Sequence, residues 1–448
     1  MIIKFKNLGP IENGEIDLND LKGINLIIGK NNTGKTYLSN LLYTYFKVRE
    51  RQNIKMDEVV GIRFKDRLSD SDYETIKDYF EKKYEKEIKD TLPQVFHTSK
   101  DIFKDFEIEV NLSDEILEFK KLDDDTIIYF REMRKTIKLK KSEDKIEYLM
   151  EDYDENKGKR YITYNRKIEE EEAKQIIFGY FLHIKFFQKI YKFYSFPAER
   201  SGAVLFYKQL LEERSDVLRE LELGNNENIG KISRYSEPVN DYVKFLNSIS
   251  DRSKGLTELD IYKKLDTELK EILGGEVIID LEGNIMFRMN EKKIIDIGMV
   301  SSTVKTLTGF YLYLKYFAME RDIIFIDEIE LNLHPENQRK IMKLINYLSK
   351  QGIKFIISTH SPIITEEIDN MLLFEKVKDK INSEEMKEYG INSEYGLKTS
   401  DINVFHLHNK TVEKIKEKNG EFEIETFNTV LEETDNLYQT LLFYAEGK

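Results

Sequence analysis

Cysteine and tryptophan are absent from this sequence of 448 residues, and proline and histidine each occur only six times. The lack of cysteine excludes disulfide bonds and thiolate metal sites, so a metal ion would have to be bound through oxygen atoms or imidazoles. No apolar run approaches the roughly 20 residues of a membrane-spanning helix. The first residues, MIIKFKNLGP, also lack the uninterrupted apolar segment of a secretory signal. We therefore expect a cytoplasmic protein with no membrane partner.

The charge is acidic, with 83 Asp and Glu residues against 70 Lys and Arg and a formal net charge of −13. This balance repels a polyanion, so nucleic acid would have to bind at a local basic patch. The best candidate is the stretch 131–141, REMRKTIKLKK, but acidic runs flank it, and a solvated strand edge is the better interpretation. Nucleic acid is a possible partner that the charge does not indicate.

A glycine-rich segment, GKNNTGKT at 29–36, matches the pattern of a phosphate-binding loop. A buried strand is expected before it, over 24–28, and a helix after it, from Thr36 to about Arg49, which is the context that such a loop requires. The alternative is an ordinary glycine turn capped by Thr36, and the apolar strand before the loop counts against it. We predict that ATP and Mg²⁺ are the cofactors and that the nucleotide is bound by Gly29, Lys30, Asn31, Asn32, Thr33, Gly34, Lys35 and Thr36.

An apolar segment at 323–326 ends in two acids, Asp327 and Glu328. In a parallel sheet the carboxyl ends of the strands form the edge where ligands bind. We expect Asp327 to hold Mg²⁺ together with Thr36, and Glu328 to polarise the water that attacks the γ-phosphate. The alternative is a buried strand that merely ends in a solvated acidic turn.

His360 follows the next expected strand, 354–358, and should lie at the same sheet edge. There it could contact the γ-phosphate or orient the attacking water, although a lone histidine is often structural. The predicted catalytic residues are therefore Glu328, His360 and Lys35, and the predicted metal ligands are Thr36 and Asp327.

Together, the loop at 29–36, FIDEIELNLHP at 325–335 and STHSP at 358–362 resemble the ATPase heads of the ABC superfamily. More narrowly, they resemble the OLD-type and SMC-like group, in which a Leu-His-Pro turn follows the acidic strand and a histidine switch follows the next one. The resemblance implies an ATP hydrolase of the α/β class, with the mixed parallel sheet of an ABC-type P-loop NTPase head. It also implies a homodimer or higher homo-oligomer in which two heads sandwich ATP.

In that family a serine-rich signature at a helix N-terminus contacts the γ-phosphate bound to the other head. Ser301 and Ser302 match it and are predicted nucleotide ligands, although Thr303 stands where glycine is usual and Ser301 could simply cap a buried helix. The resemblance further places Glu330 and Asn332 at the seam between the heads.

Two further residues are candidates for the site, Arg200 by the resemblance and Gln94 by its position in the order of motifs. Arg200, in the segment PAERSG at 197–202, resembles an arginine that lies near the nucleotide in several OLD-like ATPases, where it could sense phosphate or the partner subunit. A structural Arg–Glu pair is the alternative. Gln94 is a candidate for the Q-loop glutamine by order alone.

Composition changes along the chain and suggests a divided head. We assign 1–49 to the N-terminal part of the head and 191–380 to its C-terminal part, which contains the signature, the acidic pair and the histidine. Residues 381–448 would add strands and a helix that complete the head. Between the two parts, 50–190 is rich in Lys, Glu and Asp and poor in Gly, so we expect an inserted α+β lobe. Its expected strands include 106–110, 126–130 and 160–164, and its expected helices are 72–89 and 169–187.

The OLD-type nucleases carry a Toprim domain with an Asp-x-Asp metal pair after the head, and no such pair follows His360 here. A destructive activity would then have to come from a separate effector protein, such as a nuclease or toxin. Our leading interpretation is a sensor or scaffold ATPase of a prokaryotic antiviral defence system, resembling the stand-alone ATPase subunits of two-gene systems such as PARIS or Septu. The alternative is a RecF- or SMC-like ATPase of DNA repair or chromosome maintenance.

Overall fold

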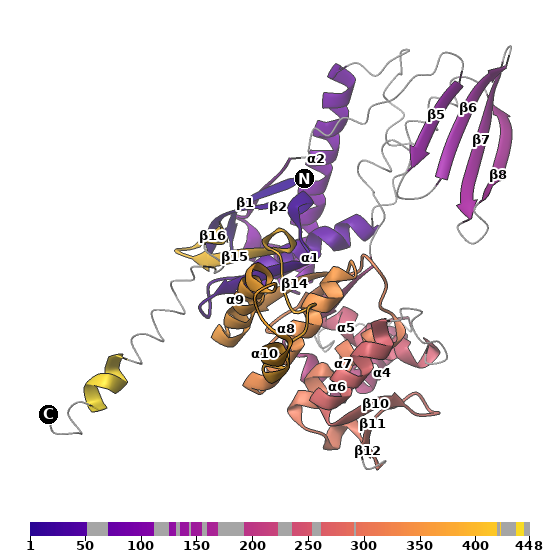
Figure 1. Cartoon of the computed structure of the whole chain (residues 1–448). Helices are drawn as coiled ribbons and strands as arrows, with labels where there is room; N and C mark the ends of the chain where they lie inside the picture. The colour runs from indigo at the N-terminus through magenta and orange to yellow at the C-terminus, as the bar shows by residue number, and fades with distance from the viewer. Residues whose placement is uncertain are drawn as a thin grey trace. The chain divides into compact units, whose positions relative to one another are not determined.

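The computed structural model (Figure 1) describes most of the chain in two compact units, which are treated separately below. The first comprises Met1–Val48, Glu81–Asn111 and Tyr191–Lys448, and the second Arg49–Phe80 and Leu112–Ile190. The described residues are 1–51, 70–111, 125–130, 135–142, 145–154, 159–168, 192–222, 235–252, 261–290, 293–418, 422 and 436–442.

A nine-stranded sheet forms the centre of the first unit. Its strands are β1 (Ile2–Leu8), β2 (Ile11–Asp17), β3 (Ile24–Gly29), β4 (Glu107–Asn111), β9 (Phe193–Phe196), β13 (Ile323–Ile326), β14 (Lys354–Thr359), β15 (Ile402–His408) and β16 (Thr411–Ile415). They lie in the order β4-β1-β2-β16-β15-β3-β14-β13-β9. From β15 to β9 every neighbouring pair is parallel, whereas β4, β1 and β2 pair antiparallel. The predicted α/β class with a mixed, mostly parallel sheet is confirmed.

The central strands are apolar because both faces of the sheet are covered. All six residues of β3 and all four of β13 are buried, as expected for strands with helices on both sides. On one face, Phe193 and Phe325 contact Tyr43 of α1 (Lys35–Arg51). On the other, Phe196 contacts Phe310 of α7 (Ser302–Tyr316).

The remaining helices of the first unit include α4 (Arg200–Glu222), α5 (Glu237–Arg252), α6 (Ile261–Leu273), α8 (Pro335–Lys350), α9 (Pro362–Val377) and α10 (Ser383–Glu388). A second sheet of this unit consists of β10 (Gly275–Ile279), β11 (Ile285–Met289) and β12 (Ile294–Asp296), in that order. Across the described ranges, no helix is both long enough and apolar enough to cross a membrane.

Part of the range predicted as the inserted lobe, 50–190, lies in the first unit, which contains Glu81–Asn111. There β4 pairs with β1, with Val110 opposite Ile3, and the end of helix α2 (Asp70–Val95) buries Tyr84 and Ile88. Burial of these apolar side chains explains the return of the chain to the head. The other predicted domain boundaries remain predictions.

The second unit contains a four-stranded antiparallel sheet of β5 (Asp125–Phe130), β6 (Lys135–Ser142), β7 (Lys145–Asp154) and β8 (Lys159–Ile168), in that order. Strands β5 and β8 contain the expected strands 126–130 and 160–164. The basic stretch falls partly on β6, while residues 131–134 and the predicted helix 169–187 lie outside the described residues.

Candidate functional site

Three neighbouring parallel strands bring the predicted site residues to one edge of the large sheet. Ile28 at the end of β3 lies opposite Thr359 of β14, and Ile357 of β14 lies opposite Ile326 of β13. The phosphate loop, His360 and Asp327 each follow one of these strands. The chain therefore brings segments about 300 residues apart in sequence to a common edge, as the strand pattern predicted.

The loop after β3 closes around the ammonium group of Lys35. Lys35 Nζ donates to the carbonyl oxygens of Gly29 and Lys30, each at 2.9 Å, and Thr33 Oγ1 donates to the Lys30 carbonyl at 2.8 Å. Lys30, Asn31, Asn32 and Thr36 are exposed, whereas Gly34 and Lys35 are buried. The loop thus has a buried lysine at its centre and exposed residues along its rim.

Gly34 is required by both space and conformation. Its φ of +105° lies in the region that favours glycine, and a Cβ at this position would lie 2.8 Å from Cγ1 of Ile11 in β2. The turn between β1 and β2 therefore packs directly against the loop, and a side chain at Gly34 would push the two apart.

Asp327 connects the acidic strand to both neighbouring motifs. Thr36 Oγ1 donates to Asp327 Oδ2 at 3.4 Å, and the Ser358 hydroxyl donates to Asp327 Oδ1. The same serine oxygen accepts the Glu328 N–H at 2.9 Å. The predicted metal ligands, Thr36 and Asp327, are thus brought together, and Ser358, the first residue of the STHSP motif, is a neighbour to which the sequence assigned no role.

The electrostatics of the site centre on Lys35. Burial lowers the pKa of Lys35, and the negative charges of Glu328, Glu330 and Asp327 oppose that shift, with Glu328 the strongest of the three. The hydrogen bonds of Asp327 to Thr36, of Glu328 to Ser358 and of Glu330 to the His360 N–H hold these acids at the same sheet edge. A phosphate bound at the loop would therefore meet the positive charge of Lys35 with negatively charged carboxylates nearby.

Glu330 lies inside the head, where the resemblance had suggested an inter-head seam. Glu330 is only 8% exposed, and its carboxylate accepts hydrogen bonds from Thr359 Oγ1 and from the His360 N–H, both at 2.8 Å. The Nδ1 atom of His360 lies 3.0 Å from Glu330 Oε1, while the His360 side chain is 40% exposed. Glu330 therefore fixes the His360 turn from within, and Asn332 remains exposed.

The predicted signature lies at the start of α7. Ser301 caps this helix, its hydroxyl oxygen accepting the Val304 N–H at 3.4 Å, and Ser302 is exposed. Thr303 Oγ1 donates to the carbonyl of Asn332 at 2.7 Å, which ties the helix start to the turn after Glu328. Gln94, the candidate by order, lies in α2, where its amide donates to the Asp90 carbonyl at 3.1 Å.

Arg200 is a buried cation that bonds to the backbone of the acidic pair. It is 2% exposed, and its guanidinium donates to the carbonyl oxygens of Pro197, Asp327 and Glu328 at 3.0, 2.6 and 2.8 Å. Its hydrogen-bond partners among the described residues are thus backbone carbonyls, and the expected role near the nucleotide stays a prediction.

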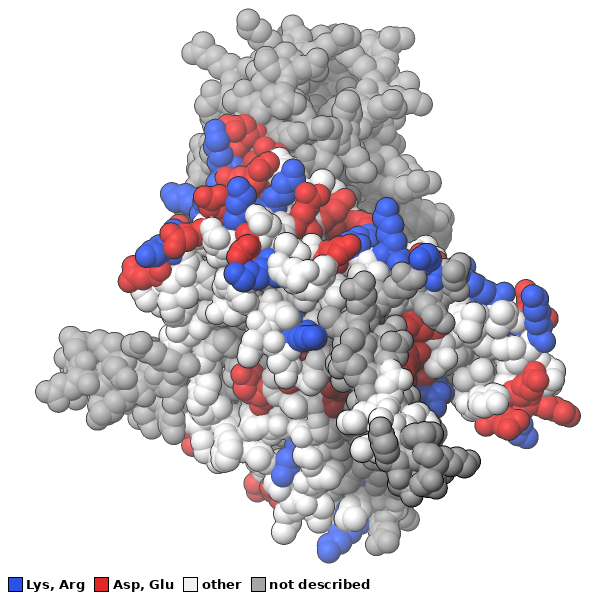
Figure 2. Space-filling view, turned by 90° about the vertical axis from the view of Figure 1, so that its left-hand side faces the viewer, with Lys and Arg blue, Asp and Glu red and all other residues white. Residues whose placement is uncertain are grey.

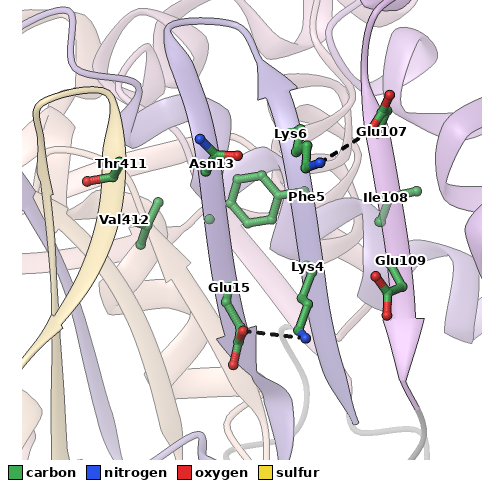
Figure 3. A pocket seen from close by; sticks show the side chains of 11 residues that line it. Lys4, Phe5, Lys6, Asn13, Glu15, Glu107, Ile108, Glu109, Thr411 and Val412 are labelled. Atoms are coloured by element: carbon green, nitrogen blue, oxygen red, sulfur yellow. Dashed lines mark ion pairs between the residues drawn. The ribbon is translucent and has the colours of Figure 1, made fainter.

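A separate hollow of about 470 Å³ lies on the outer strands (Figure 3). Its lining includes Lys4 and Lys6 of β1, which form ion pairs with Glu15 at 4.0 Å and Glu107 at 3.9 Å. Because these cations already face carboxylates, and because none of the predicted site residues lines the hollow, it is distinct from the site at the sheet edge.

Figure 2 shows Lys and Arg interspersed with Asp and Glu over the face that it presents. Among the described residues of that face, no broad basic patch stands out.

Comparison with known proteins places the chain in a family. An SMC head domain from Thermotoga maritima is 11% identical, with 93% of this chain and 98% of that chain covered and a TM-score of 0.28. An Smc head domain with an extended coiled coil, bound to the C-terminal domain of ScpA and derived from Pyrococcus furiosus, is 12% identical, with coverage of 97% and 98% and a TM-score of 0.32. A family model described as an AAA ATPase domain matches residues 1–365, a range that contains the phosphate loop, the acidic pair and His360. The chain therefore belongs to the AAA ATPase domain family.

Proposed function

We propose that this protein binds ATP with Mg²⁺ and hydrolyses it at the edge formed by β3, β14 and β13. The observation that carries this proposal is the convergence of Lys35, the Thr36–Asp327 pair and Glu328 at that edge. Membership of the AAA ATPase domain family supports it.

The residues present fit a magnesium nucleotide. Gly34 leaves the space next to Ile11 free of a Cβ, so the loop backbone can close around phosphate. The hydroxyl of Thr36 and the carboxylate of Asp327 are the hard oxygen ligands that Mg²⁺ prefers, and Mg²⁺ usually completes its shell with water and phosphate oxygens. When bound, Mg²⁺ would neutralise charge on the phosphates.

The chain's own groups then have distinct tasks. The Lys35 ammonium would exchange the carbonyls of Gly29 and Lys30 for phosphate oxygens, which form stronger, charge-assisted hydrogen bonds. Glu328 would accept a hydrogen bond from the attacking water and orient it. His360, held by Glu330, would contact the γ-phosphate or the same water.

Two substitutions test the assignment of binding and hydrolysis to different residues. Lys35→Ala should abolish binding of a fluorescent ATP analogue, because no other ammonium group reaches the loop centre in the described structure. Glu328→Gln should retain binding but lower kcat at least about 100-fold, the usual contribution of a general base.

Lys340→Ala and Glu336→Gln are matched controls, since these residues form an ion pair with each other on α8, and the pairs that Lys340 makes with Glu336 and Glu271 lie outside the nucleotide edge. Both control variants should bind and hydrolyse ATP like the wild type. A Glu328→Gln variant that turns over at the wild-type rate would remove Glu328 from the mechanism.

For the biological role, we infer an ATP-driven sensor or scaffold that acts as a homodimer and controls a separate effector in prokaryotic antiviral defence. The support is the resemblance of the three motifs to the OLD-type group. ATP would close paired heads, and a differential affinity of a few kcal/mol between two states is enough for such a switch. The measurement is phage sensitivity of cells that carry the gene with its neighbours, comparing wild type with Lys35→Ala.

Hydrolysis that is stimulated by DNA and weakened by salt would instead favour a repair ATPase.

A further inference from the structure

The guanidinium of Arg200 occupies a position that none of the functions above uses. It lies at the first residue of α4, after the edge strand β9, and is 2% exposed. Its two shortest hydrogen bonds reach across 127 and 128 residues of sequence, to the carbonyls of Asp327 and Glu328. A third, to Pro197, closes the local turn.

Burial of the Arg200 guanidinium is energetically costly, so its presence in the interior calls for an explanation. Burial lowers the pKa of Arg200, and nearby acids, including Asp327, Glu330 and Glu328, oppose that shift. Apolar side chains often replace buried charges without loss of stability, so packing alone is a weak explanation for a guanidinium here. Its planar fork of donors, however, suits two acceptors held at a fixed separation.

The two carbonyls flank a strained residue. Glu328 has a φ of +47°, in the left-handed region that residues other than glycine adopt only when their surroundings hold them there. The carbonyls of Asp327 and Glu328 belong to the peptide planes on either side of the Glu328 Cα. A single group that fixes both planes also fixes the backbone angles between them.

We propose that Arg200 is a positioning residue for Glu328, whose left-handed backbone it holds by bridging the carbonyls before and after the Glu328 Cα. The inference rests on the proposed function, because it assigns importance to the direction of the Glu328 carboxylate. Ser358 assists from the other side by accepting the Glu328 N–H.

The kinetic test is Arg200→Lys, since an ammonium group donates from one atom, whereas Arg200 uses two separate nitrogens, Nη1 for the Asp327 carbonyl and Nη2 for the Glu328 carbonyl. We expect kcat to fall roughly 10- to 100-fold, as for a misplaced catalytic group, while the Kd for ATP changes less than about threefold. In a Glu328→Gln background, Arg200→Lys should add less than about a twofold loss, because residues that act as one unit are not additive. Losses that multiply would overturn the proposal and indicate a merely structural role.

Arg339→Lys is the matched control. Arg339 lies on α8 and forms an ion pair with the buried Glu367, outside the nucleotide edge. The kcat of the Arg339→Lys variant should therefore stay within about twofold of the wild-type value. If Arg200→Lys does not fold, Arg200→Gln takes its place, since a neutral amide can donate to only part of the set and carries no charge into the interior. The same pattern of kcat, Kd and non-additivity is expected of it.

Crystal structures of the wild type and the Arg200 variant separate this inference from the proposed function. Even if the wild type did not hydrolyse ATP, the Glu328 φ should be positive with Arg200 in place and negative without it, with the loop at 29–36 unchanged. A Glu328 backbone that stays left-handed in the variant would overturn the positioning role whatever the ATPase assay shows.

Discussion

Asp322 is a buried carboxyl group just before β13, and its environment makes folding depend on pH. The residue is 3% exposed, and its Oδ2 atom accepts from Tyr313 Oη at 2.8 Å and from the Met319 N–H at 3.0 Å. Burial raises the pKa of Asp322 to about 6, against the action of those hydrogen bonds. The folded chain therefore holds this proton more tightly than the unfolded chain. The contribution of Asp322 to the free energy of unfolding therefore falls as the pH rises from about 4 to about 6 and stays low above that range.

Asp322→Asn should therefore stabilise the protein at pH 7.5. The amide oxygen can still accept from Tyr313 and Met319, but no charge is buried, and the gain is at most ~3 kcal/mol for a shift of this size. Urea unfolding between pH 4 and pH 8 is the measurement. The stabilisation should shrink as pH falls through 6 and be nearly absent near pH 4. A gain that is equal at all pH values would show that Asp322 is not the titrating group.

At this scale the sequence predicts the residues of contiguous motifs better than those that act across the fold. Lys35, Thr36 and Asp327 were recognisable because each motif carries its residues within a few positions, and the structure brings Thr36 and Asp327 into contact. Arg200 was singled out through the resemblance, but its hydrogen-bond partners were not predicted, because they are backbone carbonyls 127 and 128 residues away and a carbonyl leaves no signal in the sequence. Glu330 was placed at a seam for a similar reason, since its partners on the His360 turn become neighbours only when β13 and β14 pair.

At the scale of helices, replacement by alanine should have opposite effects at two glycines, Gly309 and Gly202. Gly309 of α7 faces α5 so closely that a Cβ would lie 2.2 Å from Tyr242 Oη and 2.5 Å from its Cε2. Tyr242 is 1% exposed and has no open space to move into. Gly202 of α4, in contrast, has no heavy atom within 4 Å of the position that a Cβ would take.

We expect Gly309→Ala to destabilise the fold by about 1–3 kcal/mol, because overpacking outweighs the better helix propensity of alanine. Gly202→Ala should stabilise it by about 0.5–1 kcal/mol, because only the propensity changes. Chemical denaturation of both variants gives the comparison. Equal effects at the two sites would mean that α7 and α5 are not packed as closely as the structure shows.

Element positions followed the periodicity of the sequence, while pairing partners did not. The segments around the phosphate loop and the acidic pair, β3, α1, β13 and β14, lie where apolar runs and turns predicted them. Strand β4 was also expected near its observed place, but it was assigned to the inserted lobe. Its alternation of buried and exposed residues specifies a strand with one covered face, and says nothing about which sheet supplies the neighbour. Pairing with β1, about 100 residues earlier, is decided by tertiary packing.

On the scale of the whole molecule, the proposed closure of two heads on ATP can be tested through Ser302. This residue is exposed at the start of α7, where helix N–H groups and a free hydroxyl suit a phosphate. In the Glu328→Gln background, ATP should double the mass from 53.2 kDa by light scattering, and Ser302→Arg should prevent the doubling.

Ser383→Arg is the control for that experiment, because Ser383 is an exposed first residue of α10 and lies outside the proposed interface. It should dimerise with ATP as the Glu328→Gln parent does. A dimer that survives Ser302→Arg would show that the start of α7 does not meet a partner's nucleotide.

The position of β3 has a consequence for how the protein is made. All six residues of this strand are buried, yet its neighbours β14 and β15 come from the far end of the chain, and Asn25 bonds to a carbonyl 330 residues later. At roughly 5–20 residues per second, a ribosome needs on the order of 15–65 s to supply the first of these neighbours. During that interval both edges of an apolar strand stay unpaired, an arrangement that favours aggregation and slow folding. Nascent chains of this protein should therefore depend on chaperones until the last third of the sequence has emerged.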